Sequence, residues 1–315
     1  MSIVVVGSVA LDTIHTPQSS HRDLVGGSAF YFSLAASHFT DVKVVAVVGD
    51  DFAPAHVELL RVRGIDVAGL QQVEGRTFRW EGRYEDDPNV RQTLRTELGV
   101  FEDFHPVLPE SYRGMSALFL ANIDPRLQLE VLGAAGDVDL VAVDTMNFWI
   151  TGNREMVDRV IERAQVLLVN DEEAHMLTAD PSTVRAAEKI RAMGPTVVVV
   201  KKGAHGAAAL GPWGWLLFPA LPVNDVLDPT GAGDAFAGGL LGALNGVDWR
   251  QREAFATAMA TGTAVASLVV ERFGVDGIAR RQPEQVRARC AALREAMRFE
   301  VPSIEGLRAK AESKE

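Results

Sequence analysis

The chain has 315 residues, 47% of them hydrophobic and 23% charged, a composition that favours a globular fold and excludes a disordered one. Its 31 basic and 42 acidic residues give a net charge of −11 without a run of lysine and arginine, so nucleic acid is not an expected partner. Because this charge repels anions at long range, any phosphate site must draw on backbone N–H groups or a metal ion.

The cysteine content and the apolar stretches bear on location. A single cysteine, Cys290, excludes an internal disulfide framework and a cysteine-based zinc site, as expected in a reducing compartment. No basic residue precedes the apolar residues 3–6, so they are interpreted as a first strand and not as a signal peptide. The apolar stretch 255–270 is shorter than a bilayer requires. We therefore expect a cytoplasmic protein that does not bind membranes.

Short β-branched runs recur along the chain, and most precede a helical pattern. They cover residues 3–6, 42–48, 117–121, 140–143, 166–169 and 196–200. Strands that alternate with helices predict an α/β fold with a mostly parallel sheet covered on both faces. Ligands of such sheets bind beyond the carboxyl ends of the strands. Candidate site residues are therefore those that follow each run: Asp12, Gly49, Asn122, Asp144, Asn170 and Gly203.

One region departs from this pattern. Residues 76–84 alternate in character like an exposed antiparallel strand, and residues 93–101 are a candidate partner. We predict a small β lid formed by about residues 12–26 and 74–103, inserted in a single domain that spans residues 1–315. Asp50 or Asp51 is expected to cap the next helix. The last dozen residues are expected to form a solvated or frayed helix.

The most informative stretch is Asp-Pro-Thr-Gly-Ala-Gly-Asp-Ala-Phe over residues 228–236. Pro-Thr-Gly indicates a turn, and the Gly/Ala-rich continuation to Leu244 predicts a buried helix. Gly231, Ala232 and Gly233 would then lie at a helix N-terminus, where free N–H groups attract phosphate oxygens.

Asp234 follows directly, in the first turn of the same predicted helix. A carboxylate repels phosphate, so its presence there favours a base that accepts a proton from an attacking hydroxyl. The alternative is an acid that only complements the helix dipole, as first-turn acids commonly do.

The chain resembles a known family in this segment. The sequence of residues 228–236 is similar to the second hallmark motif of ribokinase (PfkB-type) carbohydrate kinases. The resemblance implies a ribokinase-like α/β fold, ATP and Mg²⁺ as cofactors, and Asp234 as catalytic base. It also implies that Gly231, Ala232 and Gly233 form the anion hole for the transferred phosphoryl group. Asp228 would help to hold a monovalent cation, which makes K⁺ a secondary expectation.

Two further motifs match the family's nucleotide side. Residues 170–173 resemble its Asn-x-x-Glu motif, which implies that Asn170 and Glu173 organise Mg²⁺ and phosphate, mostly through water. Without the resemblance, Glu173 would be interpreted as a helix-start acid. Residues 202–206 resemble its Gly-x-x-Gly turn, which implies that Lys202, Gly203 and Gly206 lie along the ATP. In the late helix no asparagine is available to stack on adenine, so Thr261, Thr263 or Ser267 must take that place, and Thr263 is the candidate chosen.

The substrate side resembles the family less closely. Asp12 would bind substrate hydroxyls, and Gly26 and Gly27 match the family's double glycine, but Tyr31 stands where many sugar kinases of the family have asparagine. With Trp80 it makes this side aromatic, able to stack a nucleobase as well as a sugar face. Arg83 and Asn122 complete the predicted substrate residues.

The sequence thus predicts a kinase that transfers the γ-phosphoryl group of ATP to a hydroxyl of a sugar or sugar-like molecule. A nucleoside kinase of the same family is the alternative enzyme, and a non-catalytic nucleotide-binding regulatory protein is the alternative from another class. No P-loop, Rossmann or hydrolase motif competes with these hypotheses. Because the lid would expose a strand edge, we also expect a homodimer joined through the lid.

Overall fold

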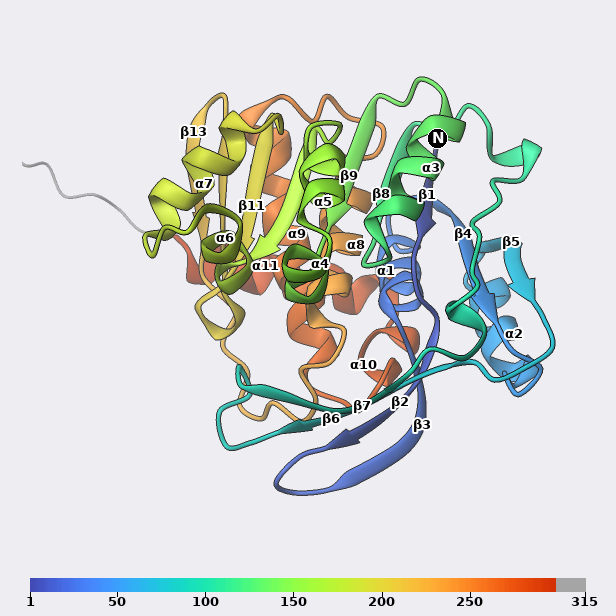
Figure 1. Cartoon of the computed structure of the whole chain (residues 1–315). Coiled ribbons are helices and arrows are strands. Elements are labelled where there is room, and N and C mark those ends of the chain that lie inside the picture. The colour runs from blue at the N-terminus through green and yellow to red at the C-terminus, as the bar shows by residue number, and fades with distance from the viewer. Residues whose placement is uncertain (299–315) are drawn as a thin grey trace, which may run out of the picture.

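The computed structural model describes residues 1–298, which form a layered body built on one large sheet and a separate small sheet (Figure 1). The frayed helix expected for the last dozen residues lies outside this range. Among the described residues, no helix has the length and hydropathy that a membrane crossing would need.

The large sheet has nine strands in the order β13-β12-β11-β10-β9-β8-β1-β4-β5. The seven strands from β11 to β5 run parallel, whereas β12 is antiparallel to both of its neighbours, β11 and β13. Their bounds are β1 Ser2–Val6, β4 Asp41–Val48, β5 Asp66–Gln72, β8 Ala117–Leu120, β9 Leu140–Asp144, β10 Val166–Asn170, β11 Val197–Lys201, β12 Ala207–Gly211 and β13 Gly214–Phe218. The mostly parallel sheet is confirmed; β5, β12 and β13 were not predicted.

Helices cover both faces of this sheet, because alternate strand residues point to opposite sides and both sides are apolar. Ile3 and Val5 pack with one layer, and Val4 and Val6 with the other. The first layer contains α1 Ser28–Ala36, α2 Pro54–Val62, α8 Ala232–Leu244, α9 Arg252–Val269, α10 Asp276–Ala279 and α11 Pro283–Ala296. The second contains α3 Pro125–Ala135, α4 Asn147–Gly152, α5 Arg154–Ile161, α6 Asp171–Thr178 and α7 Thr183–Ala192.

Helix α8 runs through the middle of the first layer, between α1 and α9. Its glycines allow this close packing: a Cβ at Gly238 would lie 2.5 Å from the carbonyl oxygen of Phe32, and one at Gly239 would lie 3.0 Å from the Cα of Gly262. The Gly/Ala-rich sequence therefore forms the buried helix that was predicted, and the packing fixes the position of its N-terminus.

The small sheet has the order β3-β2-β6-β7 and lies beneath the body in Figure 1. Its strands are β2 Ala10–His15, β3 Ser20–Gly26, β6 Phe78–Tyr84 and β7 Arg91–Glu97. The last strand differs from the predicted 93–101, since a short 3₁₀ turn, Gly99–Phe101, replaces its end where Gly99 has φ +53°. A left-handed residue of this kind ends an extended strand.

The connection between body and small sheet corrects the prediction for Asp51. Helix α2 begins after Ala53 without a side-chain cap. The Asp51 carboxylate instead accepts hydrogen bonds from the backbone N–H and the hydroxyl of Thr77, at 2.7 and 2.6 Å, and from Arg79 at 3.0 Å. Asp51 thus fixes the start of β6 to the end of β4, which a helix cap would not do.

Candidate active site

The N-terminus of α8 forms the centre of the candidate site. Gly231 precedes it with φ +74°, a conformation that favours glycine, and a Cβ at this position would overlap the ring of Tyr31. The first-turn N–H groups of an α-helix lack partners within the helix, so this end can receive an anion. Asp234 lies in that first turn, as the sequence predicted.

Asp234 is half-buried and surrounded by charge. Burial raises the pKa of its carboxyl to about 7, with a further increase from Asp144, while Lys201 and Arg91 oppose the shift. A carboxylate with such a pKa can accept a proton near neutral pH, which suits a general base better than a solvated aspartate would.

Three strands of the large sheet deliver polar residues to the same place. Asp144, Asn170 and Lys201 are the last residues of the parallel neighbours β9, β10 and β11. The Lys201 ammonium lies 2.6 Å from an Asp144 oxygen and 3.6 Å from where a Cβ on Gly233 would be. Burial lowers the pKa of Lys201, but Asp144 and Glu173 outweigh it, so the pKa lies above its ordinary value.

Asn170 and Glu173 form a capping box at the start of α6. Each side chain accepts a hydrogen bond from the other residue's backbone N–H, at 2.7 and 2.8 Å. Glu173 is buried, and this burial raises its pKa to about 7. The helix-start role and the predicted metal role are compatible, because the box uses one carboxylate oxygen and leaves the other to bind water.

The side chains near Glu173 suit the ligand preference of Mg²⁺. Within residues 1–298 no group of three or more His, Cys, Asp or Glu side chains could hold a metal ion. Mg²⁺ keeps several waters and takes few carboxylates, so one glutamate and one asparagine beside a phosphate site fit its preference.

Asp228 is fully buried and fixes the turn before α8. One oxygen accepts from the N–H of Thr230 at 2.9 Å and the other from the N–H of Gly274 at 2.8 Å. Burial raises the pKa of Asp228 above its ordinary value, against the effect of these bonds. Asp228 therefore connects the α8 turn to the segment that follows α9.

The predicted nucleotide turn follows β11. Gly203 and Gly206 both have positive φ, and the Lys202 backbone N–H donates to the Gly206 carbonyl at 2.8 Å. Asn89, from the β6–β7 hairpin, contacts Gly203 and accepts a hydrogen bond from the N–H of Ala204 at 3.1 Å. The small sheet thus reaches the nucleotide turn as well as the substrate side.

Thr263, the residue predicted to contact the nucleobase, is buried within α9, and its contact with a nucleotide stays a prediction. Thr263 lies in the middle of α9, is 6% exposed, and donates its hydroxyl proton to the Met259 carbonyl one turn earlier, at 2.9 Å. A threonine in a helix commonly makes this bond when its side chain faces other helices.

On the substrate side, Asp12 and Tyr31 are buried next to the α8 turn. Asp12 contacts Gly26, and burial followed by the charges of Asp228 and Asp234 raises its pKa to about 8. The Tyr31 hydroxyl is buried and has no hydrogen-bond partner among the described residues. A buried polar group without a partner is uncommon and indicates a place where a ligand could supply one.

Strand β6 presents its alternate residues to the body. The Tyr84 hydroxyl lies 3.1 Å from that of Thr230, in the α8 turn. The Trp80 ring lies over Gly82, where a Cβ would overlap it, and its N–H donates to Thr93 at 3.2 Å. The Arg91 guanidinium lies 5.4 Å from the centre of the Trp80 ring.

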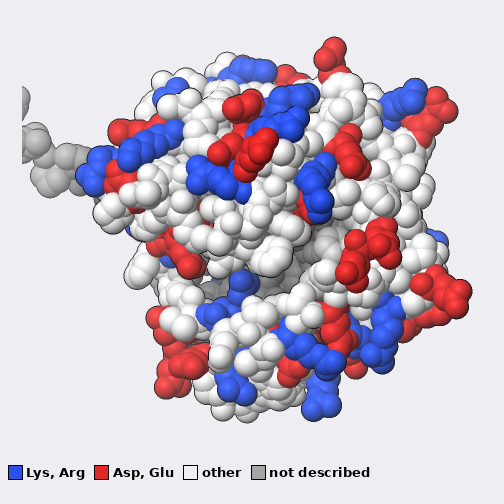
Figure 2. Space-filling model, viewed as in Figure 1, with Lys and Arg blue, Asp and Glu red and all other residues white. Residues whose placement is uncertain are grey.

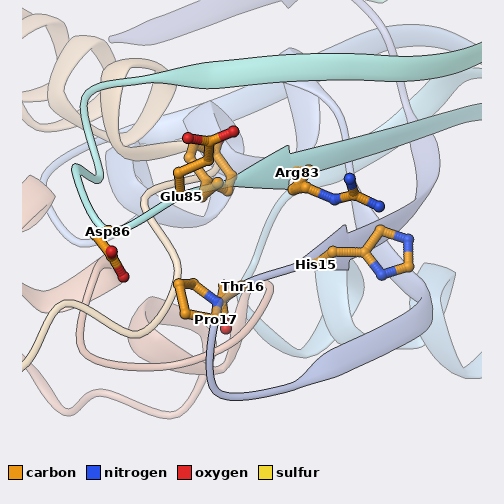
Figure 3. A pocket seen from close by; sticks show the side chains of 7 residues that line it. His15, Thr16, Pro17, Arg83, Glu85 and Asp86 are labelled. Atoms are coloured by element: carbon orange, nitrogen blue, oxygen red, sulfur yellow. The ribbon is translucent and has the colours of Figure 1, made fainter.

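Arg83 has the opposite orientation, since a strand turns successive side chains to opposite faces. It pairs in register with His15 and lines an outer pocket with Pro17, Glu85 and Asp86, where Figure 3 shows the two basic side chains side by side. The structure therefore places Arg83 on the face of β6 opposite Tyr84, and its contact with the substrate stays a prediction. Arg91, also from the small sheet, is the arginine that acts on Asp234.

Asn122 follows β8, at the same edge of the large sheet. Its side-chain oxygen accepts from the indole N–H of Trp149 at 3.1 Å, and its nitrogen donates to the sulfur of Met146. The side chain is half-buried. Figure 2 shows a hollow in the surface between the body and the small sheet, and the residues described above come from both sides of this junction.

The sequence alone assigned no role to four residues that the structure brings to the candidate site: Asp144, Lys201, Asn89 and Arg91. Asp144 was marked as a strand-end residue without a role, and Lys201 was passed over in favour of Lys202, although it ends the β-branched run and thus obeys the strand-end rule. Asn89 and Arg91 lie in and beside a hairpin whose sequence has no pattern that identifies a site.

An α/β fold with an anion-binding helix N-terminus, an adjacent carboxylate base and a covering sheet defines a class, the small-molecule phosphotransferases. Comparison with family models makes the class specific, since residues 2–280 match the model described as the pfkB family of carbohydrate kinases. The chain belongs to this family and is a kinase whose phosphoryl acceptor is a hydroxyl group.

Individual relatives agree. The chain is 29% identical over 248 residues to the cytidine kinase of Thermococcus kodakarensis, with 76% of this chain and 87% of the relative covered. The nucleoside kinase of Burkholderia thailandensis in complex with inosine has TM-score 0.75 at 22% identity over 94% of this chain and 97% of its own. A ribokinase II from E. coli in complex with ATP and Mg²⁺ has TM-score 0.74 at 17% identity, covering 92% and 99%. At 22% and 17% identity, the similarity to these two solved structures establishes the fold of this chain and not its substrate.

Proposed function

We propose that this chain is an ATP- and Mg²⁺-dependent kinase that phosphorylates a ribose hydroxyl of a nucleoside. The observation that carries the kinase chemistry is the position of Asp234, whose carboxyl has a pKa of about 7 in the first turn of a helix that follows a glycine turn. The nucleoside acceptor is the alternative to the predicted sugar acceptor, and it depends on the aromatic residues of the small sheet.

In the proposed reaction Asp234 removes the proton from the acceptor hydroxyl as the oxygen attacks the γ-phosphorus of ATP. The N–H groups of Gly231, Ala232 and Gly233 hold the phosphoryl oxygens, whose negative charge they stabilise with their partial positive charges. Lys202, Gly203 and Gly206 would lie along the remaining phosphates and the ribose of ATP.

Mg²⁺, when bound, neutralises phosphate charge, and Asn170 and Glu173 would hold it through water. Glu173→Gln is then expected to lower activity, and full activity in excess chelator would remove the metal from the proposal. Asp228 would contribute to a K⁺ site beside the α8 turn. Equal rates in Na⁺-only and K⁺ buffers would contradict that part.

The acceptor side supports a nucleoside because it combines hydroxyl-binding and aromatic groups. Asp12 and the unpartnered Tyr31 hydroxyl lie close enough to Asp234 for its charge to act on both, and Gly26 contacts both side chains. A ribose would present its hydroxyls to this group, with Gly26 and Gly27 as the predicted double glycine of the substrate side. Trp80 offers a flat surface for a base, and Asn122 lies at the same strand edge. Among the relatives, the cytidine kinase and the inosine-bound nucleoside kinase support the same class.

A panel of nucleosides and free sugars, assayed with ATP and Mg²⁺, tests the acceptor. We expect turnover on at least one nucleoside with a kcat/KM above that on any free pentose or hexose. Turnover on free sugars but on no nucleoside would contradict the nucleoside acceptor and support a sugar kinase. Nucleotide binding without turnover on any acceptor would favour the non-catalytic regulatory alternative. A pure binder has no use for a base at Asp234.

The small sheet is proposed to act as a lid and as a dimer interface. Its edge strand β7 is almost entirely exposed, with Val90 and Leu94 both in solvent, a liability that pairing with a second copy would remove. A monomer by light scattering at micromolar concentration would contradict the homodimer. The proposed location is the cytoplasm, in keeping with the single cysteine.

A further inference from the structure

Lys201 lies among acidic groups before any ligand binds. Asp144, Glu173 and Asp234 all interact with Lys201, and ATP would bring several more negative charges to the same place. The amides of the α8 turn supply only partial positive charge. A full positive charge at this point would therefore act directly on the transferred group.

Lys201 is built into that position. It ends β11, only 19% of its side chain is exposed, and the nearest atom to the space beside Gly233 is its ammonium nitrogen. Arg91 also acts on Asp234, but it is exposed and comes from the small sheet, so its position depends on that sheet. Lys201 is fixed by the body alone.

The hydrogen bonds of Lys201 leave it capacity for a ligand. An ammonium group has three N–H donors, and within the described residues one of them is used, by Asp144. A buried ion pair with no other role is a weak source of stability, because apolar residues of similar volume often do as well. The Lys201–Asp144 pair lies beside the glycine turn before α8. A lysine there can bind a phosphate oxygen, which an apolar residue cannot do.

We propose that Lys201 binds the phosphoryl group in transit, and that Asp144 holds the ammonium in position until ATP arrives. This deepens the proposed function and rests on it. In the step, the acceptor oxygen forms a bond to the γ-phosphorus, its proton goes to Asp234, and the bond from phosphorus to the β–γ bridging oxygen breaks. ADP leaves with that electron pair, and Lys201 neutralises the oxygens of the group that moves.

The test compares binding of two nucleotides by calorimetry, so it needs no knowledge of the acceptor. Lys201→Met is expected to weaken the ATP analogue AMP-PNP by roughly 10- to 100-fold, the usual effect of one charge-assisted hydrogen bond, while ADP changes by less than about threefold. Asp144→Asn releases the ammonium and is expected to preserve or tighten AMP-PNP binding. Lys189→Met, which removes the exposed partner of the buried Asp180, is the matched control and should change neither affinity.

The double variant Lys201→Met, Asp144→Asn separates this proposal from a purely structural pair. If the pair only supports the fold, removing both charges restores AMP-PNP binding; if Lys201 binds the phosphoryl group, the loss persists. Equal losses for ADP and AMP-PNP, or no loss in Lys201→Met, would also overturn the proposal. If Lys201→Met does not fold, the Asp144→Asn variant alone tests the proposal, and weaker AMP-PNP binding in that variant would overturn it.

The failure of this proposal is distinct from that of the proposed function. Wild-type protein that binds AMP-PNP no better than AMP, or an Asp234→Asn variant with full turnover, would remove the kinase mechanism itself. An inactive Asp234→Asn together with an unaffected Lys201→Met would remove only the role of Lys201.

Discussion

The body and the small sheet contribute different kinds of residue to one site. The body supplies charged groups at strand ends and at a helix N-terminus, and backbone geometry fixes them: Asp144, Lys201 and Asp234 each belong to a regular element. The small sheet supplies mainly aromatic and hydroxyl-binding groups. The difference suggests that the body determines the chemistry and the small sheet determines which acceptor enters.

The two regions also differ in how they are held. Helix α8 is packed on both sides by other helices, whereas the small sheet contacts the body through a few side chains. These contacts include Tyr84 with Thr230 and Asn89 with Ala204, and a stacked pair of His21 with Phe273. A region with so few buried contacts belongs to the less stable part of a fold, as lids do.

The largest expected effect is on the body. Asp234→Asn should lower turnover by roughly 10²–10⁴-fold, the usual contribution of a positioned base, while preserving the fold and nucleotide binding. Steady-state kinetics on the best acceptor measure this effect. Glu253→Gln is the matched control, because Glu253 is an exposed first-turn acid of α9, and it should have no effect. Near wild-type turnover in Asp234→Asn would reduce Asp234 to a helix-dipole role.

The second expected effect is a pH dependence of kcat/KM, which arises from Asp234 in the body. Because burial raises the pKa of Asp234 to about 7, the base is protonated and inactive below that pH. The value of kcat/KM should therefore fall about tenfold for each pH unit below the pKa and level off above it. A profile that stays flat down to about pH 5 would show that no group with this pKa limits the reaction.

The third effect concerns the small sheet. Trp80→Ala removes the flat aromatic surface and should raise the acceptor KM by roughly tenfold, in line with the loss of one base-stacking contact, with a smaller change in kcat. Wasteful ATP hydrolysis should also increase, because the site excludes water less well. Arg83→Ala on the outer face is the control. If both variants match wild type in KM, selectivity and hydrolysis, the aromatic residues there are structural.

The same division explains what the sequence could and could not predict. Apolar β-branched runs locate buried parallel strands, and a long motif locates Asp234, because both signals are local in the chain. The direction of Arg83, the burial of Thr263 and the reach of Asn89 to Ala204 depend on strand register and on helix packing across distant segments. Short-range patterns do not determine these properties.

The smallest expected effect tests the contact that joins the two regions at the nucleotide turn. Asn89→Ala removes one exposed hydrogen bond to the N–H of Ala204, a bond of about 0.5–1.5 kcal/mol, so closure of the small sheet should weaken by a factor of roughly 2–10. The acceptor KM should rise by that factor while thermal stability stays unchanged, since the body does not depend on Asn89. Asn153→Ala, at a helix start where the side chain makes no capping bond, is the matched control. An unchanged acceptor KM in Asn89→Ala would mean that the hairpin does not hold the small sheet closed, and that other contacts, such as those of Tyr84 and His21, connect it to the body.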